Sequence, residues 1–290
     1  MKVTGFTFIR NAVKYDYPVI ESIKSVLPVC DEFIVVAGNS EDSTRQLIET
    51  IGAGKIKIID TIWDDNLREG GRVLALETDK AFRAIADDTD WCFYIQGDEV
   101  VHEKYLPEIR SAMQKNLNDK NVDGLVFKYL HFYGSYDYVG ESYQWYRNEV
   151  RVIRNNKNIY SYRDAQGFRK DNNKRLNVKE VDAYIYHYGW VKKPDAMQKK
   201  QEDFNKLWHD DKWIEKNIPK KNEFDYSNID ILRKFTGTHP EVMQERIHKI
   251  NWKFDYDISK GELKFKDKLK KMCEKLGFDI GQYKNYRLLK

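Results

Sequence analysis

Apolar residues in the first hundred positions follow two alternating patterns. Short continuous apolar runs are typical of strands buried on both faces of a sheet, and they lie at 2–9, 33–37, 55–60 and 91–96. Segments with apolar residues at helical spacing separate these runs, at 18–27, 45–51 and 73–85. Because strand and helix alternate, the pattern predicts an α/β domain with a largely parallel sheet.

A polar residue follows the end of each predicted strand. These residues are Asn11, Asn39, Asp64 and Asp98. In sheets of this kind, ligands bind beyond the carboxyl ends of the strands. We therefore expect the four side chains to gather along one edge of the sheet, at a binding site.

The pattern changes in the second half of the chain. Strand-like runs recur at 124–132, 149–153 and 181–188, and from Pro194 onward the pattern is helical and charged. We expect a domain over 1–193, divided near residue 105, and a mainly helical region over 194–290. The stretch 260–275 holds seven lysines and lies beside a helical stripe of Leu263, Leu269, Met272 and Leu276. This pattern favours a solvated helix that packs through the stripe, and the alternative is a helix on a membrane surface.

Composition limits the class of protein. With 41% apolar and 33% charged residues, the chain is typical of a globular protein, and its formal charge of only +4 gives no reason to expect nucleic acid as a partner. The 19 tyrosines indicate either a sugar-binding surface or, as favoured here, a tyrosine-rich core. The three cysteines are far apart, and the sequence has no apparent signal peptide or membrane-spanning run. We expect a cytoplasmic protein, with the inner face of the membrane as the alternative.

Three segments carry a resemblance to a known family. They read FIRNAVKYDYPVIESIKSV, DEFIVVAGNSEDST and DWCFYIQGDEVVHE. In this order they are similar to the opening strand, the Asp-x-Gly-Ser-x-Asp-x-Thr turn and the Asp-x-Asp strand end of the family 2 glycosyltransferases. The resemblance covers roughly the first 105 residues. It implies the nucleotide-diphospho-sugar transferase (GT-A) fold, with a nucleotide-sugar-binding half over 1–105 and an acceptor-side half over 106–193.

The sequence departs from the family pattern at two points. Ala37 stands where the family usually has an aspartate that contacts the nucleobase, and Gly38-Asn39 replaces the usual x-Gly. Gln96 stands at the first aspartate of Asp-x-Asp. As a neutral amide, Gln96 can hydrogen-bond a ribose hydroxyl but cannot supply the missing charge.

The resemblance implies a divalent cation, Mn²⁺ or Mg²⁺, beside the diphosphate of the donor. Such ions bind oxygen ligands, and one or two carboxylates suffice when phosphates and water complete the shell. Asp98 is the first candidate ligand, although Asp98-Glu99 capping the helix near Lys104 is an alternative. His187 is the second, with a structural histidine as the alternative. His102 and His131 are weaker candidates.

An inverting transferase also needs a carboxylate that accepts a proton from the attacking hydroxyl. Asp164 is the candidate base, with Glu149 and Glu141 as rivals. By the same resemblance, contacts to substrate are expected from Arg10, Asn11, Asn39, Asp42, Gln96, Gly97, Arg151, Arg163 and Arg169.

The sequence therefore predicts a metal-assisted, inverting glycosyltransferase. Its donor would be a nucleotide-diphospho-sugar, with a UDP-sugar favoured, and its acceptor a hydroxyl of a glycan or lipid-linked saccharide in polysaccharide synthesis. The basic C-terminal helix is a candidate for peripheral membrane contact. Two alternatives remain: a nucleotidyltransferase on a similar sheet, and a non-catalytic sugar- or protein-binding module.

Overall fold

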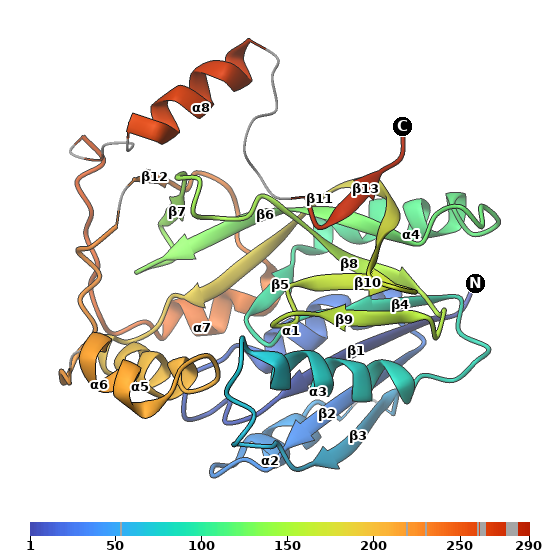
Figure 1. Cartoon of the computed structure of the whole chain (residues 1–290), viewed down its shortest axis with the longest axis horizontal. Helices are drawn as coiled ribbons and strands as arrows, with labels where there is room; N and C mark the ends of the chain where they lie inside the picture. The colour runs from blue at the N-terminus through green and yellow to red at the C-terminus, as the bar shows by residue number, and fades with distance from the viewer. Residues whose placement is uncertain (53, 219, 230, 260, 262–264, 277–283) are drawn as a thin grey trace.

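The computed structural model of the chain describes residues 1–290 except 53, 219, 230, 260, 262–264 and 277–283. At its centre is a mixed sheet in the order β3-β2-β1-β4-β8-β6-β11-β10-β9 (Figure 1). The strands on this path are β1 (Val3–Ile9), β2 (Glu32–Gly38), β3 (Ile56–Thr61), β4 (Trp91–Tyr94), β6 (Gly124–Tyr133), β8 (Asn148–Arg154), β9 (Ile159–Tyr162), β10 (Gly167–Lys170) and β11 (Lys174–Trp190).

The direction of the strands differs between the two halves of the sheet. Strands β3, β2, β1 and β4 run parallel, with Phe6 paired to Ile34 on one side and to Tyr94 on the other. Strand β8 lies antiparallel between β4 and β6, and β6 and β11 then pair in parallel. The predicted α/β fold, in which helices flank a sheet of parallel strands, is confirmed. The second half of the sheet is mixed rather than mostly parallel.

Helices cover both faces of the parallel strands. Helices α1 (Val19–Val26) and α4 (Leu106–Lys115) pack on one face, and α3 (Arg72–Arg83) packs on the other. Because successive residues of a strand point to opposite faces, Phe33 joins the core under α1 and Ile34 joins the core under α3. Burial on both faces explains why these strands are continuous apolar runs. The short helix α2 (Thr44–Glu49) follows β2.

The segment after β4 differs from the sequence prediction. Strand β4 ends at Tyr94, and the short strand β5 (Glu99–Val101) then pairs antiparallel with β11. Strand β11 is longer than predicted because its first residues pair with β10 and with the last strand, β13 (Tyr286–Leu288). The residues between β4 and β5 therefore form a turn held between β1, β8 and β11.

The region after β11 contains helices and short strands. Its helices are α5 (Pro194–Asn205), α6 (Asp211–Asn217), α7 (Gln244–His248) and α8 (Phe265–Lys275). Strand β12 (Leu232–Lys234) pairs with β7 (Tyr138–Gly140). A short 3-10 turn occurs in this region at Glu241–Met243, and two others occur earlier in the chain, at Leu27–Val29 and Glu103–Tyr105. Figure 1 shows α5 and α6 beside the carboxyl ends of β6 and β11, and α8 at the periphery.

Helix α8 does not bury its apolar stripe, contrary to the favoured prediction. Leu269 is 44% exposed and Met272 is 55% exposed, whereas Leu263 lies outside the described residues. Lys270 instead faces the body of the protein, with its ammonium 5.1 Å from the ring centre of Tyr143. Among the described residues, no helix has the length and apolar character needed to cross a membrane.

Many tyrosines lie in the core, as favoured from the composition. Their hydroxyls have polar partners: Tyr129 donates to Glu99, and Tyr226 donates to the carbonyl of Lys192. Tyr133, Tyr138 and Tyr226 form an aromatic cluster under the C-terminal region. Many of the tyrosines therefore stabilise the fold rather than mark a sugar-binding surface.

Candidate active site

A pocket of about 640 Å³ lies at the carboxyl edge of the parallel strands. Its volume is in the range of pockets that bind small ligands. Of the polar residues predicted to gather there, Asn11 and Asp98 line the pocket. Asn39 does not line it, because its side-chain oxygen accepts a hydrogen bond from the backbone of Trp63. Asp64 also lies outside the lining, and the adjacent Asp65 takes its place.

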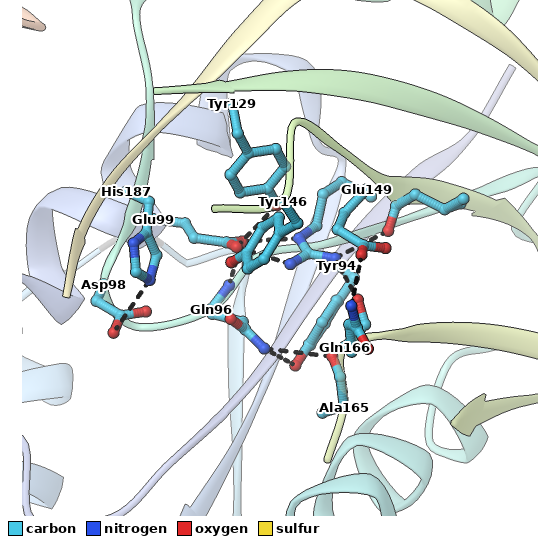
Figure 2. Close-up of polar contacts among 12 residues, drawn as sticks. Tyr94, Gln96, Asp98, Glu99, Tyr129, Tyr146, Glu149, Ala165, Gln166 and His187 are labelled. Carbon is cyan, nitrogen blue, oxygen red and sulfur yellow. Dashed lines mark hydrogen bonds and ion pairs between the residues drawn. The ribbon is translucent and has the colours of Figure 1, made fainter. Parts of the chain in front are cut away.

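The turn that carries Asp98 is held by a buried ion pair. Glu99 is fully buried, and its two carboxylate oxygens accept hydrogen bonds from Nε and Nη2 of Arg151 at 2.8 and 2.7 Å. The same carboxylate accepts bonds from the Tyr129 hydroxyl and from the backbone N–H of Gln96. Figure 2 shows this network at the centre of the site, with Asp98 and His187 to one side of Glu99. Glu99 thus fixes the turn. Its carboxylate does not cap the helix near Lys104, which was the alternative.

Gln96 ties the turn to the loop after β9. Its side-chain Nε2 donates to the hydroxyl of Tyr94 and to the carbonyl of Ala165, both at 3.3 Å (Figure 2). An aspartate has only acceptors when ionised, so it could not donate to the Ala165 carbonyl. The neutral amide of Gln96 therefore makes a structural hydrogen bond that an aspartate could not make. Gln96 also lines the pocket.

Asp98 lies close to the imidazole ring of His187 and to the ammonium of Lys200. Its Oδ2 is 3.7 Å from Nε2 of His187 and 3.6 Å from Nζ of Lys200. Burial favours the neutral acid, but the positively charged forms of His187, Lys200 and Lys192 outweigh burial and lower the pKa of Asp98. Asp98 is therefore a carboxylate at neutral pH.

Gly189 keeps the space between Asp98 and His187 open. A Cβ atom at this position would lie 2.6 Å from Oδ2 of Asp98 and 2.9 Å from Nε2 of His187. Such distances are far below van der Waals contact, so any larger residue would displace one of the two groups. Gly189 is needed because Asp98 and His187 lie close to its Cα atom, and not because of its backbone angles.

A second histidine sets the tautomer of His187. Nε2 of His131 lies 2.7 Å from the carbonyl oxygen of Tyr146, and a carbonyl only accepts, so this nitrogen carries the proton. Burial lowers the pKa of His131 well below its usual range, so the ring is neutral and its Nδ1 is an acceptor. The Nδ1 of His187, 3.1 Å away, must then donate to it. Burial also lowers the pKa of His187, so its ring is neutral and the lone pair of its Nε2 faces Asp98.

This arrangement fits a divalent cation. A carboxylate and an unprotonated imidazole nitrogen face each other across a gap that Gly189 keeps free, and two such acceptors need a cation or a donor between them. Among the described residues, no group of three or more His, Cys, Asp or Glu forms a complete protein cage. Mn²⁺ or Mg²⁺ bound here would complete its shell with water and substrate phosphates, as these ions commonly do.

The predicted base lines the same pocket from another element. Asp164 is half-buried between β9 and β10, next to Gly71 and Trp208. Burial raises the pKa of its carboxyl group, which makes it a better proton acceptor than an exposed aspartate. Asp164 and Asp98 therefore line the same pocket from different elements.

The two rivals of Asp164 do not line this pocket. Glu149 is buried behind the wall, where one oxygen accepts a bond from Gln166 at 3.1 Å and the other has no partner (Figure 2). Burial raises its pKa from 4.5 to about 8, so it is largely protonated at neutral pH. Glu141 lies near Arg233, outside the pocket.

The remaining predicted contacts divide into two groups. Arg10 and Gly97 line the pocket with Asn11 and Gln96. Asn39, Asp42 and Arg169 do not: Asp42 accepts from the backbone of Thr44 and Lys14, and Arg169 donates to the carbonyl of Asn285. Arg163 lines a neighbouring cavity. Arg151 reaches the wall of the main pocket, but its hydrogen bonds go to Glu99 and to the carbonyls of Val150 and Gln166.

Sequence reasoning missed two residues that shape the site. Lys200 comes from α5, and Gly189 follows His187 by two positions. His131, a weaker candidate ligand from the sequence, instead contacts His187. Since alternate residues of a strand share a face, the spacing of His187 and Gly189 was a readable signal. The sequence gives no such signal for Lys200, because a lysine in a charged helix is expected to be exposed to solvent.

Comparison with known proteins finds no matching family model and no matching curated protein. Among solved structures, S. aureus TarS is 14% identical, with a TM-score of 0.40 over 70% of this chain and 38% of that chain. S. aureus TarS 1–349 in complex with UDP is 15% identical, with a TM-score of 0.40 over 70% and 64%.

Glucosyl-3-phosphoglycerate synthase from Mycobacterium tuberculosis, in complex with Mn²⁺, UDP and phosphoglyceric acid, is 17% identical, with a TM-score of 0.31 over 45% and 43%. This chain covers less than two thirds of the length of each of these solved chains.

Replacing His131 with phenylalanine tests the tautomer argument. The ring would still fill its place among Tyr129, Trp145 and Tyr146, but the acceptor for His187 would be lost. We expect Mn²⁺ affinity, measured by calorimetry in the presence of UDP, to fall by about 10- to 100-fold. His102→Phe, at a buried histidine outside the pocket, should leave it unchanged. Equal affinity in His131→Phe and the wild type would contradict the assignment.

The raised pKa of Glu149 predicts a pH-dependent stability. Between its ordinary pKa of 4.5 and the folded value of about 8, the folded state binds the extra proton. Stability should therefore fall as pH rises through this window, by on the order of 3 kcal/mol between pH 5 and pH 8. Urea unfolding at both pH values measures it. Glu149→Gln should remove this dependence, and Glu108→Gln, at an exposed position of α4, should keep it.

Proposed function

We propose that the chain is a glycosyltransferase that moves a sugar from a nucleotide-diphospho-sugar to an acceptor hydroxyl. The observation that carries the proposal is the convergence of the Asp98 carboxylate and the unprotonated Nε2 of His187 at the carboxyl edge of a parallel sheet. A third group, Asp164, faces the same pocket and suits a proton acceptor. Of these three residues, Asp98 lies in a segment that resembles the family 2 glycosyltransferases, whereas His187 and Asp164 lie outside the resembling segments.

The proposed reaction is a single displacement. Asp164 accepts the proton of the acceptor hydroxyl while that oxygen attacks the anomeric carbon, and the bond from this carbon to the diphosphate breaks. Attack opposite the leaving group inverts the configuration of the anomeric carbon. Asp98 and His187 would hold Mn²⁺ or Mg²⁺, which neutralises charge on the departing diphosphate when bound.

The donor side of the pocket is proposed to bind the nucleotide near the ends of β1 and β2. Phe8 and Trp63 line this side with Arg10, whose guanidinium lies 5.5 Å from the Trp63 ring. Apolar rings beside a cation suit a planar base and its phosphates. Because Ala37 removes the family's nucleobase carboxylate, we name UDP-sugars only as the first donors to test. The acceptor is proposed to be a glycan or a lipid-linked saccharide.

A panel of nucleoside diphosphates tests the proposal. One of UDP, GDP or dTDP should raise the melting temperature in the presence of Mn²⁺, and its sugar conjugate should be slowly hydrolysed. Asp98→Asn should lose the Mn²⁺-dependent shift. Asp164→Asn should keep the shift but transfer sugar about 10²- to 10⁴-fold more slowly, because only the proton acceptor is removed.

Two results would overturn parts of this proposal. Nucleotide binding without hydrolysis or transfer by the wild type would favour a non-catalytic binding module. A full Mn²⁺-dependent shift in Asp98→Asn would remove Asp98 from the cation site. Asp65→Asn, which changes a carboxylate that lines the pocket and pairs with Arg10, is the matched control.

We also propose that α8 contacts the surface of an anionic membrane. Phe265 is 75% exposed beside the exposed Leu269 and Met272, and Lys266, Lys268 and Lys271 flank this stripe. An apolar stripe bordered by lysines matches an anionic lipid surface.

Co-sedimentation with vesicles checks this membrane contact. We expect binding to vesicles that contain phosphatidylglycerol and not to pure phosphatidylcholine. A double change, Leu269→Ser with Met272→Ser, should weaken binding about tenfold or more, since it removes buried apolar area. Ile62→Ser, at an exposed apolar residue after β3, is the control. Equal binding by the double variant and the wild type would contradict the proposal.

A further inference from the structure

Lys200 is a buried lysine that points from α5 into the pocket. Its side chain is only 10% exposed, and its ammonium donates to the carbonyl of Gly189 at 3.0 Å and lies 3.6 Å from Oδ2 of Asp98. The ammonium also lies 4.9 Å from the ring centre of Tyr17, which lines the pocket as well. A buried ammonium is costly unless it has an anionic partner, and the partner of Lys200 is Asp98.

The other cations that line the pocket have carboxylate partners of their own. These pairs are Arg10 with Asp65, Lys14 with Glu41 and Asp203, Arg68 with Asp211, Arg151 with Glu99, and Lys206 with Asp203. Lys200 differs because its partner is the carboxylate that faces His187. The cation proposed at that site and the lysine therefore share one carboxylate.

Sharing a carboxylate has a consequence for Lys200. When a divalent cation takes the charge of Asp98, the attraction between Asp98 and the ammonium falls, and the two cations repel each other. The ammonium then needs another anion close by. A phosphate oxygen held by the same ion would share the coordination shell with Oδ2 of Asp98, which lies 3.6 Å from Nζ of Lys200. That position is within reach of Nζ of Lys200.

We propose that Lys200 binds the diphosphate of the donor and exchanges Asp98 for a phosphate oxygen when donor and cation enter together. This inference rests on the proposed function, because it names the group that holds the leaving diphosphate. It also makes Lys200 a second positive charge on that diphosphate, at a site where Gln96 has replaced a carboxylate. The pocket is then more positive than a site with two acidic ligands would be, which favours a doubly charged leaving group.

Lys192 does not compete for this role. Its ammonium is fully buried, donates to the backbone carbonyl of Asp16 at 2.7 Å and lies 4.3 Å from the ring centre of Tyr17. It does not line the pocket. Lys192 therefore adds positive potential near Asp98 and supports the loop before α1, whereas Lys200 contacts the pocket itself.

Two titrations by calorimetry test the proposal, and each uses the full chain. The first measures Mn²⁺ alone, and the second measures UDP at saturating Mn²⁺. In Lys200→Gln, we expect Mn²⁺ alone to bind about tenfold more tightly, because a like charge beside Asp98 is gone. We expect UDP at saturating Mn²⁺ to bind about tenfold more weakly, because the diphosphate loses its ammonium. Lys200→Arg should keep UDP binding within about threefold of the wild type.

Lys206→Gln, at a lysine that lines the pocket and pairs with Asp203, is the matched control and should change neither titration. Weaker binding of both ligands in Lys200→Gln would mean that Lys200 only supports the fold of the site, and would overturn the inference. Unchanged UDP binding in that variant would overturn it as well. If the wild type itself binds none of UDP, GDP or dTDP, with or without Mn²⁺, the proposed function fails first.

Discussion

The buried ion pair between Glu99 and Arg151 is the interaction on which the site depends. It joins the turn after β4 to β8, two segments that are 52 residues apart in the sequence. Both side chains are almost completely buried, so removing either partner would leave an uncompensated charge, which typically costs about 3–5 kcal/mol. The pair stays favourable because hydrogen bonds from Tyr129 and from the backbone of Gln96 satisfy the rest of the carboxylate.

This ion pair also decides where the neighbouring residues point. With Glu99 directed inward at the start of β5, the preceding turn residue Asp98 lines the pocket. Across the site, β6 and β11 pair in parallel with His131 opposite His187, so their register alone brings the two rings together. The positions of Asp98 and His187, the proposed ligands of a cation, thus follow from the ion pair of Glu99 and from the register of β6 and β11.

The sequence predicted the part of the site that depends on local order. The apolar runs located β1 to β4, and the polar residues after them marked the correct edge of the sheet for Asn11 and Asp98. The assignment of Asn39 as a substrate contact came from sequence position, whereas the structure uses its side chain within the turn after β2. Arg151 stands between Val150 and Val152 in a strand whose middle is buried. An arginine in such an apolar stretch indicates a buried ion pair.

Long-range features could not be predicted from local patterns. Lys200 reaches Asp98 only because β11 ends beside the pocket and α5 then turns back across it. The hydrogen bond from Gln96 to Ala165 joins residues 69 positions apart, and the local sequence of neither segment predicts it. Residue types near strand ends indicate that a site exists, but the partners of each charge depend on the complete fold.

The amide of Gln96 has a mechanical consequence. Because it connects the strand end that carries Asp98 to the loop that carries Asp164, these two walls form one unit and cannot separate without breaking its hydrogen bonds. A separate wall is formed by α5 and the residues after it, which include Trp208; the backbone N–H of Gly71 donates to the carbonyl of Leu207 in this wall. Widening the pocket to admit a bulky ligand would therefore require movement of this helical wall, and Lys200 would move with it.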